Sequence, residues 1–95
     1  MIICAAIKPQ IVRNGKPHET VIHGLRHANC WELMADMGIR ATYEEVTEGF
    51  IDNQNRFLDR YDAFSHALEC GQLPATVREC KREKGERQLY SEDLY

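Results

Sequence analysis

The feature that most constrains the fold is the apolar run at the start of the chain. Ile2–Ile7 reads Ile-Ile-Cys-Ala-Ala-Ile and is followed by Lys8 and Pro9. A short apolar run with β-branched ends is typical of a strand that is buried on both faces at the centre of a sheet. Such a strand needs neighbours, so we expect the rest of the N-terminal half to supply them.

The first neighbour is predicted by a turn sequence. Asn14-Gly15 is the pair most favoured in two-residue hairpin turns, and it separates Ile11-Val12-Arg13 from Thr20-Val21-Ile22-His23. We expect these two arms to pair antiparallel across a loop that Lys16-Pro17-His18 extends. Two short strand-like pieces, Glu48–Asp52 and Arg56–Asp59, follow later around the turn-rich Asn53-Gln54-Asn55.

Two helices are predicted from caps and spacing. Asn29 with Glu32 resembles a capping box, which places a helix over about 30–37 that ends at Gly38. Asp59 resembles a second N-cap, and Gly71 ends that helix. Its apolar face would consist of Tyr61, Phe64, Ala67 and Leu68.

The last quarter of the chain gives less regular patterns. Pro74 interrupts the sequence, and the almost solidly charged run Arg78–Arg87 is typical of a solvated loop or helix tip. Leu89–Tyr95 is apolar enough to return to the body of the protein as an edge strand. The fold class expected is therefore α+β, with a small antiparallel sheet from the N-terminal half and two or more helices packed on it.

Length and charge restrict the function. A chain of 95 residues is expected to form one domain over residues 1–95 and to bury only about 60–65% of its unfolded surface, which favours self-association. A net charge of −3 argues against a general binder of DNA or RNA polymers. No apolar run approaches the ~20 residues of a membrane span, and the start lacks the charged region of a signal peptide, so we expect a cytosolic protein without membrane partners.

The cysteines and histidines suggest little metal chemistry. The four cysteines are widely spaced and contain no C-x-x-C pair, so they are interpreted as small buried hydrophobes or inert thiols. His23, His27 and Cys30 are three residues of the types that bind zinc, but no fourth ligand follows at a recognisable spacing. The alternative is a partly exposed histidine pair at a strand end, and the reading adopted has no metal and no cofactor.

Arginines and aromatic side chains form the strongest candidate site. A guanidinium group can bind two phosphate oxygens at once and keeps its charge at any relevant pH. The candidate arginines are Arg26, Arg56, Arg60, Arg78, Arg82 and Arg87. Arg56 and Arg60 flank the helix start proposed at Asp59, whose amide donors would add to an anion site. Phe50, which follows Gly49, and the late tyrosines Tyr90 and Tyr95 could stack on a base. The simpler alternatives are solvated arginines and aromatic residues packed in the core.

Catalysis has little support in the sequence. Ser91-Glu92-Asp93 combines a hydroxyl with two acids, but no histidine adjoins it, and neither a glycine-rich phosphate loop nor a recognised nucleophile motif is present. We therefore expect a protein that is not an enzyme.

Five segments, read in order, resemble a known family. They are MIICAAI, GLRH, EGFID, RFLDRYDAFSHALECGQL and LYSEDLY. Together they are similar to the first-described type of phage Thoeris anti-defence protein. The resemblance implies a sponge that binds cyclic ADP-ribose-type signals made by bacterial TIR-domain proteins, including glycocyclic ADP-ribose, in the cytoplasm of the infected host. It implies no cleavage, so that the downstream NAD-consuming effector is never activated.

The resemblance also implies partners and site residues. Members form dimers that assemble into hexamers, and some bind cyclic trinucleotides at a separate site. Matched to this sequence, the motifs assign Phe50 to the base, Asp59 to a ribose hydroxyl, and the remaining ligand contacts to Arg26, Arg56, Arg60, Ser91, Glu92 and Asp93. The rival hypotheses are a small protein-binding inhibitor or assembly module and a hydrolase that degrades the signal.

Overall fold

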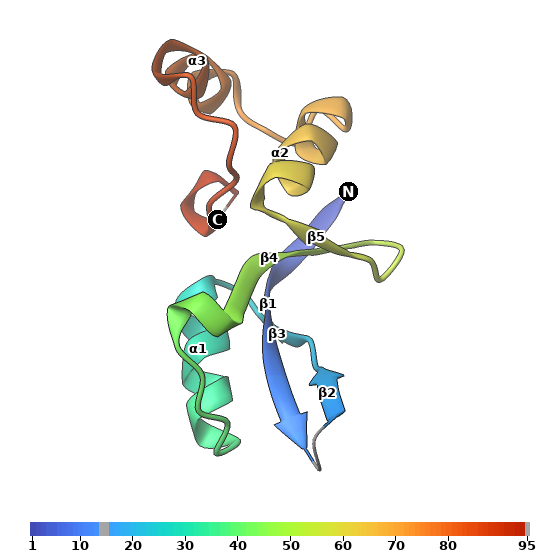
Figure 1. Cartoon of the computed structure of the whole chain (residues 1–95). Helices are drawn as coiled ribbons and strands as arrows, with labels where there is room; N and C mark the ends of the chain where they lie inside the picture. The colour runs from blue at the N-terminus through green and yellow to red at the C-terminus, as the bar shows by residue number, and fades with distance from the viewer. Residues whose placement is uncertain (14–15, 95) are drawn as a thin grey trace.

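The computed structural model describes residues 1–13 and 16–94. Its elements in chain order are β1 (Ile2–Arg13), β2 (Lys16–Glu19), β3 (Ile22–Gly24), α1 (His27–Asp36), η1 (Tyr43–Glu45), β4 (Val46–Asp52), β5 (Phe57–Asp59), α2 (Arg60–Glu69), α3 (Ala75–Lys84) and η2 (Ser91–Asp93). The predicted α+β class is confirmed, with an antiparallel sheet in the N-terminal half and helices packed against it (Figure 1).

The sheet is organised around β1, as the apolar opening predicts. In the described residues the strand order is β2-β1-β4-β5, and β3 also pairs with β1. β3 pairs with Ala5–Ile7 and β2 with Gln10–Arg13, so β1 continues through Pro9, which stands between the two pairings. Ile2 and Ile7 are buried, and Pro9 is among the most deeply buried side chains.

The hairpin was predicted with the wrong register. Lys16-Pro17-His18, expected to extend the loop, belongs to β2 instead, and Arg13 pairs with Lys16. Strand pairing therefore begins at Lys16, and Ile22–Gly24 pairs with an earlier part of β1, Ala5–Ile7. Asn14 and Gly15 themselves lie outside the described residues.

The helix boundaries agree with the predictions better than the predicted buried faces do. Asp59 caps α2, and Gly71, at a φ of 66°, follows its end. The buried residues of α2 are Ala63 and Ala67, whereas Tyr61 and Leu68 are exposed. α1 begins three residues earlier than expected, because Asn29 is the third helical residue and accepts the Arg26 backbone N–H at 3.2 Å.

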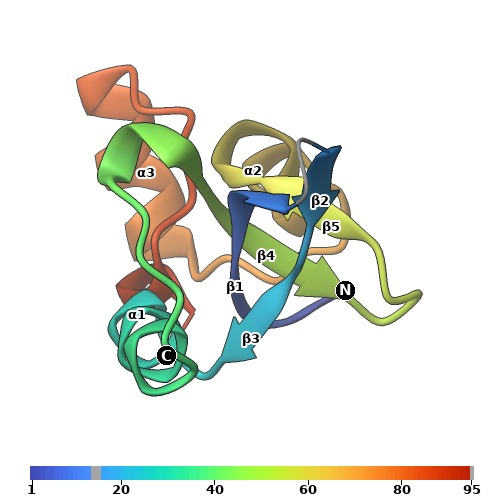
Figure 2. The same ribbon diagram turned by 60° about the horizontal axis from the view of Figure 1, so that its bottom comes forward.

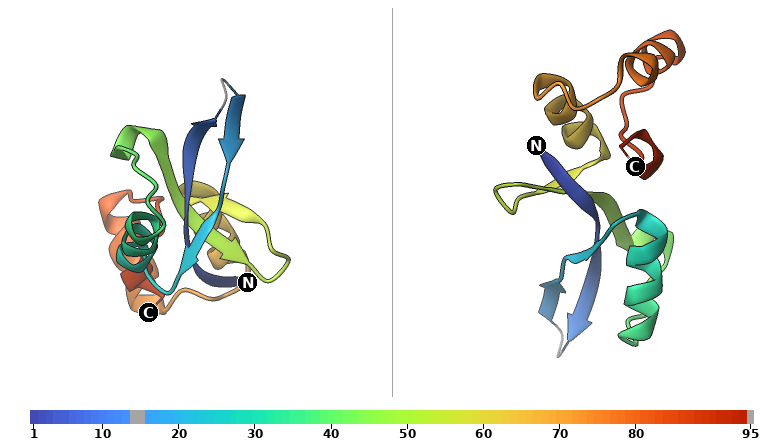
Figure 3. Two further views of the ribbon diagram at one scale, coloured as in Figure 1. Left: turned by 90° about the horizontal axis from the view of Figure 1, so that it is seen from below. Right: turned by 180° about the vertical axis from the view of Figure 1, so that it is seen from behind.

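The C-terminal quarter differs most from expectation. The charged run is solvated for the most part, as expected, but its first part, residues 78–84, belongs to the regular helix α3 and is not a loop. This helix begins after Pro74 and is followed by Gly85 in the left-handed conformation. The tail is not an edge strand: its described part forms η2 and returns between α1 and α2 (Figure 3). Tyr95, also expected in that strand, lies outside the described residues.

The core lies on one face of the sheet. Ala5, Ile7 and Phe50 of the strands meet Cys30 and Met34 of α1. The same cluster includes Ala63, Ala67, Leu73 and Leu89 from the C-terminal half, so α1, α2 and the returning tail cover one side of the sheet (Figure 2). α3 projects beyond this body, which gives the molecule extents of 47 × 26 × 21 Å.

Candidate functional site

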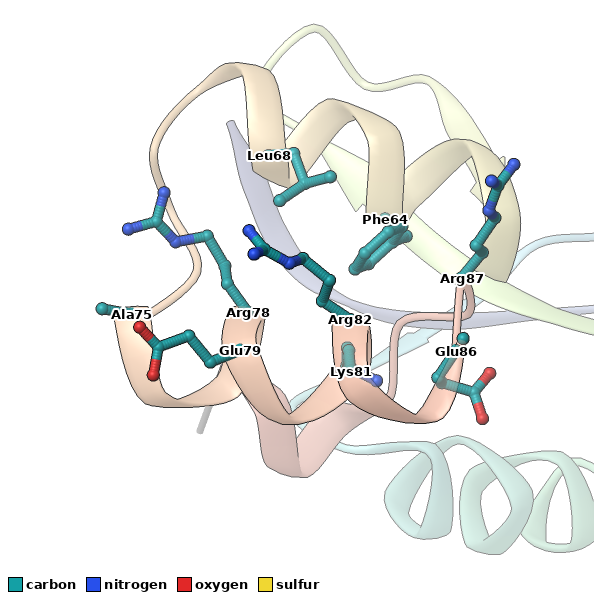
Figure 4. A pocket seen from close by; sticks show the side chains of 10 residues that line it. Phe64, Leu68, Ala75, Arg78, Glu79, Lys81, Arg82, Glu86 and Arg87 are labelled. Atoms are coloured by element: carbon teal, nitrogen blue, oxygen red, sulfur yellow. The ribbon is translucent and has the colours of Figure 1, made fainter.

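A cavity of about 530 Å³ opens between α2 and α3. Its apolar lining includes Phe64 and Leu68 from α2, and its cationic lining includes Arg78, Arg82 and Arg87. Figure 4 shows the Phe64 ring and the Leu68 side chain facing α3, with the three guanidinium groups spread along the opening. The volume falls in the ordinary range for small-molecule sites.

Local sequence explains why the arginines meet this cavity. Pro74 is the N-cap residue of α3, and its carbonyl oxygen accepts the Arg78 backbone N–H at 3.0 Å. Arg78 and Arg82 are four residues apart and therefore lie on one face of the helix. Gly85 ends the helix in a left-handed conformation, and the chain turns so that Arg87 reaches the same cavity.

The three guanidinium groups have no partner of their own in the described part of the chain. Within residues 1–13 and 16–94, no hydrogen bond or ion pair joins the side chain of Arg78, Arg82 or Arg87 to another group. Unpaired guanidinium groups attract anions and present their donors in a planar fork, and the partly exposed Phe64 ring lies in the same cavity. The arrangement suits a ligand that has both an aromatic ring and phosphate groups.

Lys81 fixes α3 to the rest of the molecule. It is the buried residue of α3, with 6% of its surface exposed. Its ammonium group lies 2.8 Å from the Asp93 carboxylate and donates to the Gln88 carbonyl at 2.7 Å. It also lies 4.7 Å from the centre of the Tyr90 ring. The tail therefore neutralises the Lys81 charge, whereas the arginine charges remain available to a ligand.

Phe50 does not have the predicted position. Its side chain is fully buried in the core, where its ring meets the His27 imidazole edge-on at 4.9 Å. Phe50 pairs with Ala5 on one side and Leu58 on the other, so it points from the middle of the sheet into the layer beneath the helices. In this chain its ring face is not open to a base, and core packing explains the residue.

The predicted arginines near Asp59 are engaged by other groups. The Arg56 guanidinium binds the Asp52 carboxylate at 2.7 Å, and Arg60 donates to Glu48 at 3.1 Å and to the Leu89 carbonyl at 2.7 Å. Asp59 accepts the Asp62 N–H at 2.8 Å as the cap of α2. These side chains hold the β4–β5 hairpin, α2 and the tail together, and none of them lines the α2–α3 cavity.

Asp52 shows how strongly this hairpin binds its carboxylate. Burial by itself raises the pKa of Asp52, but the backbone N–H groups of Arg56 and Gln54 and the Arg56 guanidinium lower it to about 2. The carboxylate accepts those N–H groups at 2.8 and 3.0 Å. Asp52 is therefore a charged structural anchor at neutral pH.

The remaining predicted residues lie at the junction of α1 and the tail. Arg26 is exposed just before α1, and Glu92 is exposed on η2. Ser91 is buried, accepts the His27 backbone N–H at 3.1 Å and lies 2.6 Å from the His27 Nδ1. Asp93 binds Lys81 and accepts the Tyr90 N–H at 2.8 Å. These residues lie where the tail meets the start of α1, and they do not line the α2–α3 cavity.

The His27–Ser91 pair has a defined proton arrangement. The Nε2 of His27 lies 2.7 Å from the Gly49 carbonyl oxygen, which can only accept, so Nε2 carries the proton. Nδ1 therefore accepts from the Ser91 hydroxyl. Burial lowers the pKa of His27, the Arg60 cation lowers it further, and the Gly49 carbonyl opposes the shift. The pair is a neutral clasp between α1, β4 and the tail.

The histidine–cysteine set considered for zinc is not assembled. His27 uses both ring nitrogens in the clasp, and burial raises the pKa of the Cys30 thiol to about 11. In the part of the chain that the structure describes, no group of three His, Cys, Asp or Glu side chains is placed to hold a metal ion. All four cysteines are free thiols; Cys30 is buried as expected, whereas Cys70 and Cys80 are exposed.

The sequence did not bring together the residues that line the cavity. Phe64 and Leu68 are predicted on a core face, and Phe64 does pack partly against the core, whereas Leu68 is exposed. Arg78, Arg82 and Arg87 belong to the candidate arginine set, but the sequence favours a solvated run for them. Pro74 and Gly85 can be interpreted as the two ends of a helix. The Arg78-x-x-x-Arg82 spacing then places both arginines on one face of that helix and indicates a cationic surface. That α2 leaves its Phe64–Leu68 edge open is a property of the tertiary structure.

The fold and this cavity define a small α+β protein with a cationic, aromatic recess. A family model described as Phage T4 y16D protein matches residues 1–95. The chain therefore belongs to this family of phage proteins. No curated protein and no solved structure gives a significant match. Among the described helices, none has the length and apolar character required to cross a bilayer.

Proposed function

We propose that this phage protein is a sponge that binds and sequesters cyclic ADP-ribose-type signalling nucleotides, such as glycocyclic ADP-ribose, without cleaving them. The observation that supports this function best is the α2–α3 cavity, which is lined by the Phe64 ring and by three arginines whose guanidinium groups lack partners in the described structure. The site proposed differs from the one that the family motifs assign, because Phe50 is buried in the core.

The chemistry of the ligand matches the groups in the cavity. A cyclic ADP-ribose has an adenine ring, two linked phosphates and ribose hydroxyls. Stacking of a base on an aromatic side chain contributes about 1–3 kcal/mol, and each hydrogen bond to a charged group about 1.5–3 kcal/mol. Phe64 with two of the three arginines would therefore be sufficient for tight capture.

The surroundings favour binding over hydrolysis. The polar groups that line the cavity in the described structure are guanidinium, ammonium and carboxylate groups. The Ser91–His27 pair has the hydrogen bond of a nucleophile and its base, but only 4% of Ser91 and 8% of His27 is exposed. A buried clasp that holds the tail is not placed to attack a ligand between α2 and α3.

The biological setting follows from the same proposal. A phage protein that holds the signal in the host cytoplasm keeps the NAD-consuming effector inactive. Assembly into dimers or hexamers and a separate site for cyclic trinucleotides belong to the proposal through the family resemblance. A small protein-binding inhibitor or assembly module is the alternative, and a signal hydrolase is the third possibility.

The test is calorimetry with cyclic ADP-ribose, followed by mass spectrometry of the nucleotide released on heat denaturation. The wild-type protein is expected to bind the probe and release it intact. Arg82→Gln should weaken binding roughly 10- to 150-fold, the equivalent of one charge-assisted hydrogen bond, and Phe64→Leu should weaken it through lost stacking. Arg40→Gln, which changes an exposed arginine away from the cavity, is the matched control.

The other outcomes identify the rival functions. Recovery of a hydrolysed product would make the protein an enzyme that degrades the signal. Failure of cyclic ADP-ribose and glycocyclic ADP-ribose to bind, or equal affinity in Arg82→Gln and wild type, would remove the support that the cavity gives to a sponge.

A further inference from the structure

The α2–α3 cavity contains negative as well as positive groups. Beside the three arginines, Glu79 and Glu86 also line it. The Lys81 ammonium is already matched by Asp93 at 2.8 Å. A ligand therefore meets three unpaired guanidinium cations together with two carboxylates, which is a weaker positive field than the arginines alone would create.

The arginine and glutamate side chains occupy different parts of the opening. Figure 4 shows the Arg82 side chain directed toward Leu68 and Phe64, whereas the carboxylates of Glu79 and Glu86 point away from the Phe64 ring, along the outer side of α3. Glu86 is held in place because its Oε1 accepts the Gln88 N–H at 3.2 Å. The inner wall thus favours a phosphate, and the outer rim repels any further phosphate that extends past it.

We infer that Glu79 and Glu86 determine specificity by charge, so that the cavity accepts a ligand with two phosphates and rejects nucleoside triphosphates. This inference rests on the proposed function. A sponge competes for its ligand against every other phosphorylated purine in the cytoplasm, and attraction by arginines alone would also retain ATP. A carboxylate that repels a phosphate of the wrong ligand lowers the affinity for that ligand, and repulsion of this kind allows a site to exclude a close analogue.

The experiment compares cyclic ADP-ribose and ATP as probes, each titrated into the full 95-residue protein at one ionic strength without divalent cations. Wild-type protein is expected to bind cyclic ADP-ribose more tightly than ATP. In the double variant Glu79→Gln/Glu86→Gln, affinity for ATP should rise at least about tenfold, and affinity for cyclic ADP-ribose should rise by a clearly smaller factor.

A matched control uses two glutamates outside the cavity. Glu69, at the end of α2, and Glu83 are exposed and do not line the cavity, so Glu69→Gln/Glu83→Gln removes the same number of charges and should leave the ratio of the two affinities unchanged. Thermal unfolding of all variants tests whether the substitutions preserve the fold. The control variant separates a local effect at the rim from a change in overall charge.

Two outcomes overturn the inference in different ways. If cyclic ADP-ribose binds but the double variant leaves its ratio to ATP unchanged, the carboxylates do not select the ligand, while the proposed function stands. If wild-type protein binds neither cyclic ADP-ribose nor glycocyclic ADP-ribose, the proposed function fails and the inference fails with it.

Discussion

Gly49 of β4 pairs with Asp59 of β5 at a position that has no room for a side chain. A Cβ at this position would overlap the Leu58 carbonyl oxygen and would lie 2.8 Å from the Cζ of Phe57. The Gly49 carbonyl oxygen also accepts from His27 at 2.7 Å. The missing side chain therefore lets the hairpin close, and the backbone carbonyl of the same residue attaches α1 to the sheet.

Gly49→Ala should accordingly destabilise the protein. The added methyl group forces β5 outward, and overpacking of this kind costs about 1–3 kcal/mol. Urea unfolding, monitored by circular dichroism, measures the change in stability. The control is Thr47→Ala, at an exposed position of the same strand. An unfolding midpoint equal to that of wild type would show that β5 moves without cost.

At the scale of elements, capping residues determine where the C-terminal helices begin and end. Asp59 closes the first turn of α2 through its bond to the Asp62 N–H, and Pro74 and Gly85 mark the ends of α3. The charged composition of residues 78–87 concealed this second helix from the sequence interpretation. Most of its side chains face solvent, and it is attached through Lys81 and the partly buried Val77.

Asp59→Ala should therefore shorten or loosen α2. Loss of an N-cap acceptor costs about 1 kcal/mol, and the unfolding midpoint should fall in proportion, whereas Asp59→Asn should retain most of the stability. Asp36→Ala, at the last residue of α1, is the comparison at an exposed aspartate. Equal losses in the alanine and asparagine variants would mean that the cap is not the source of the effect.

At the scale of the whole molecule, the tail is held by a neutral histidine. The lowered pKa of His27 means that the folded state binds the proton less readily than the unfolded state. The clasp therefore contributes its full stability above the unfolded pKa of about 6.5, and this contribution declines as the pH falls below that value.

Urea midpoints measured between pH 7.5 and 5 should thus decrease with falling pH. His27→Gln should lose most of this dependence, although it is less stable throughout, whereas substitution of the exposed His23 by Gln should keep it. A wild-type midpoint that does not change over this range would contradict the assignment. Asp52, with a pKa of about 2, adds a separate loss only as the pH falls through about 4.

The sequence by itself determined the local structure of this protein. The apolar opening predicted the central strand, and Asp59, Gly38 and Gly71 marked helix ends, because strand burial and caps depend on residues that are near one another in the chain. The α+β class followed from these elements. The register of β2 and β3 did not, since the periodicity of an extended segment fits several pairings.

Only the tertiary structure decided the candidate site. Phe50 and Phe64 are both aromatic residues near arginines in the sequence, yet one lies in the core and the other borders a cavity. Arg56 and Arg60 are paired, whereas Arg78, Arg82 and Arg87 have no such partners in the described structure. The physical reason is that burial and ion pairing depend on which elements meet in space, and the packing of α2, α3 and the tail sets those contacts over long sequence separations.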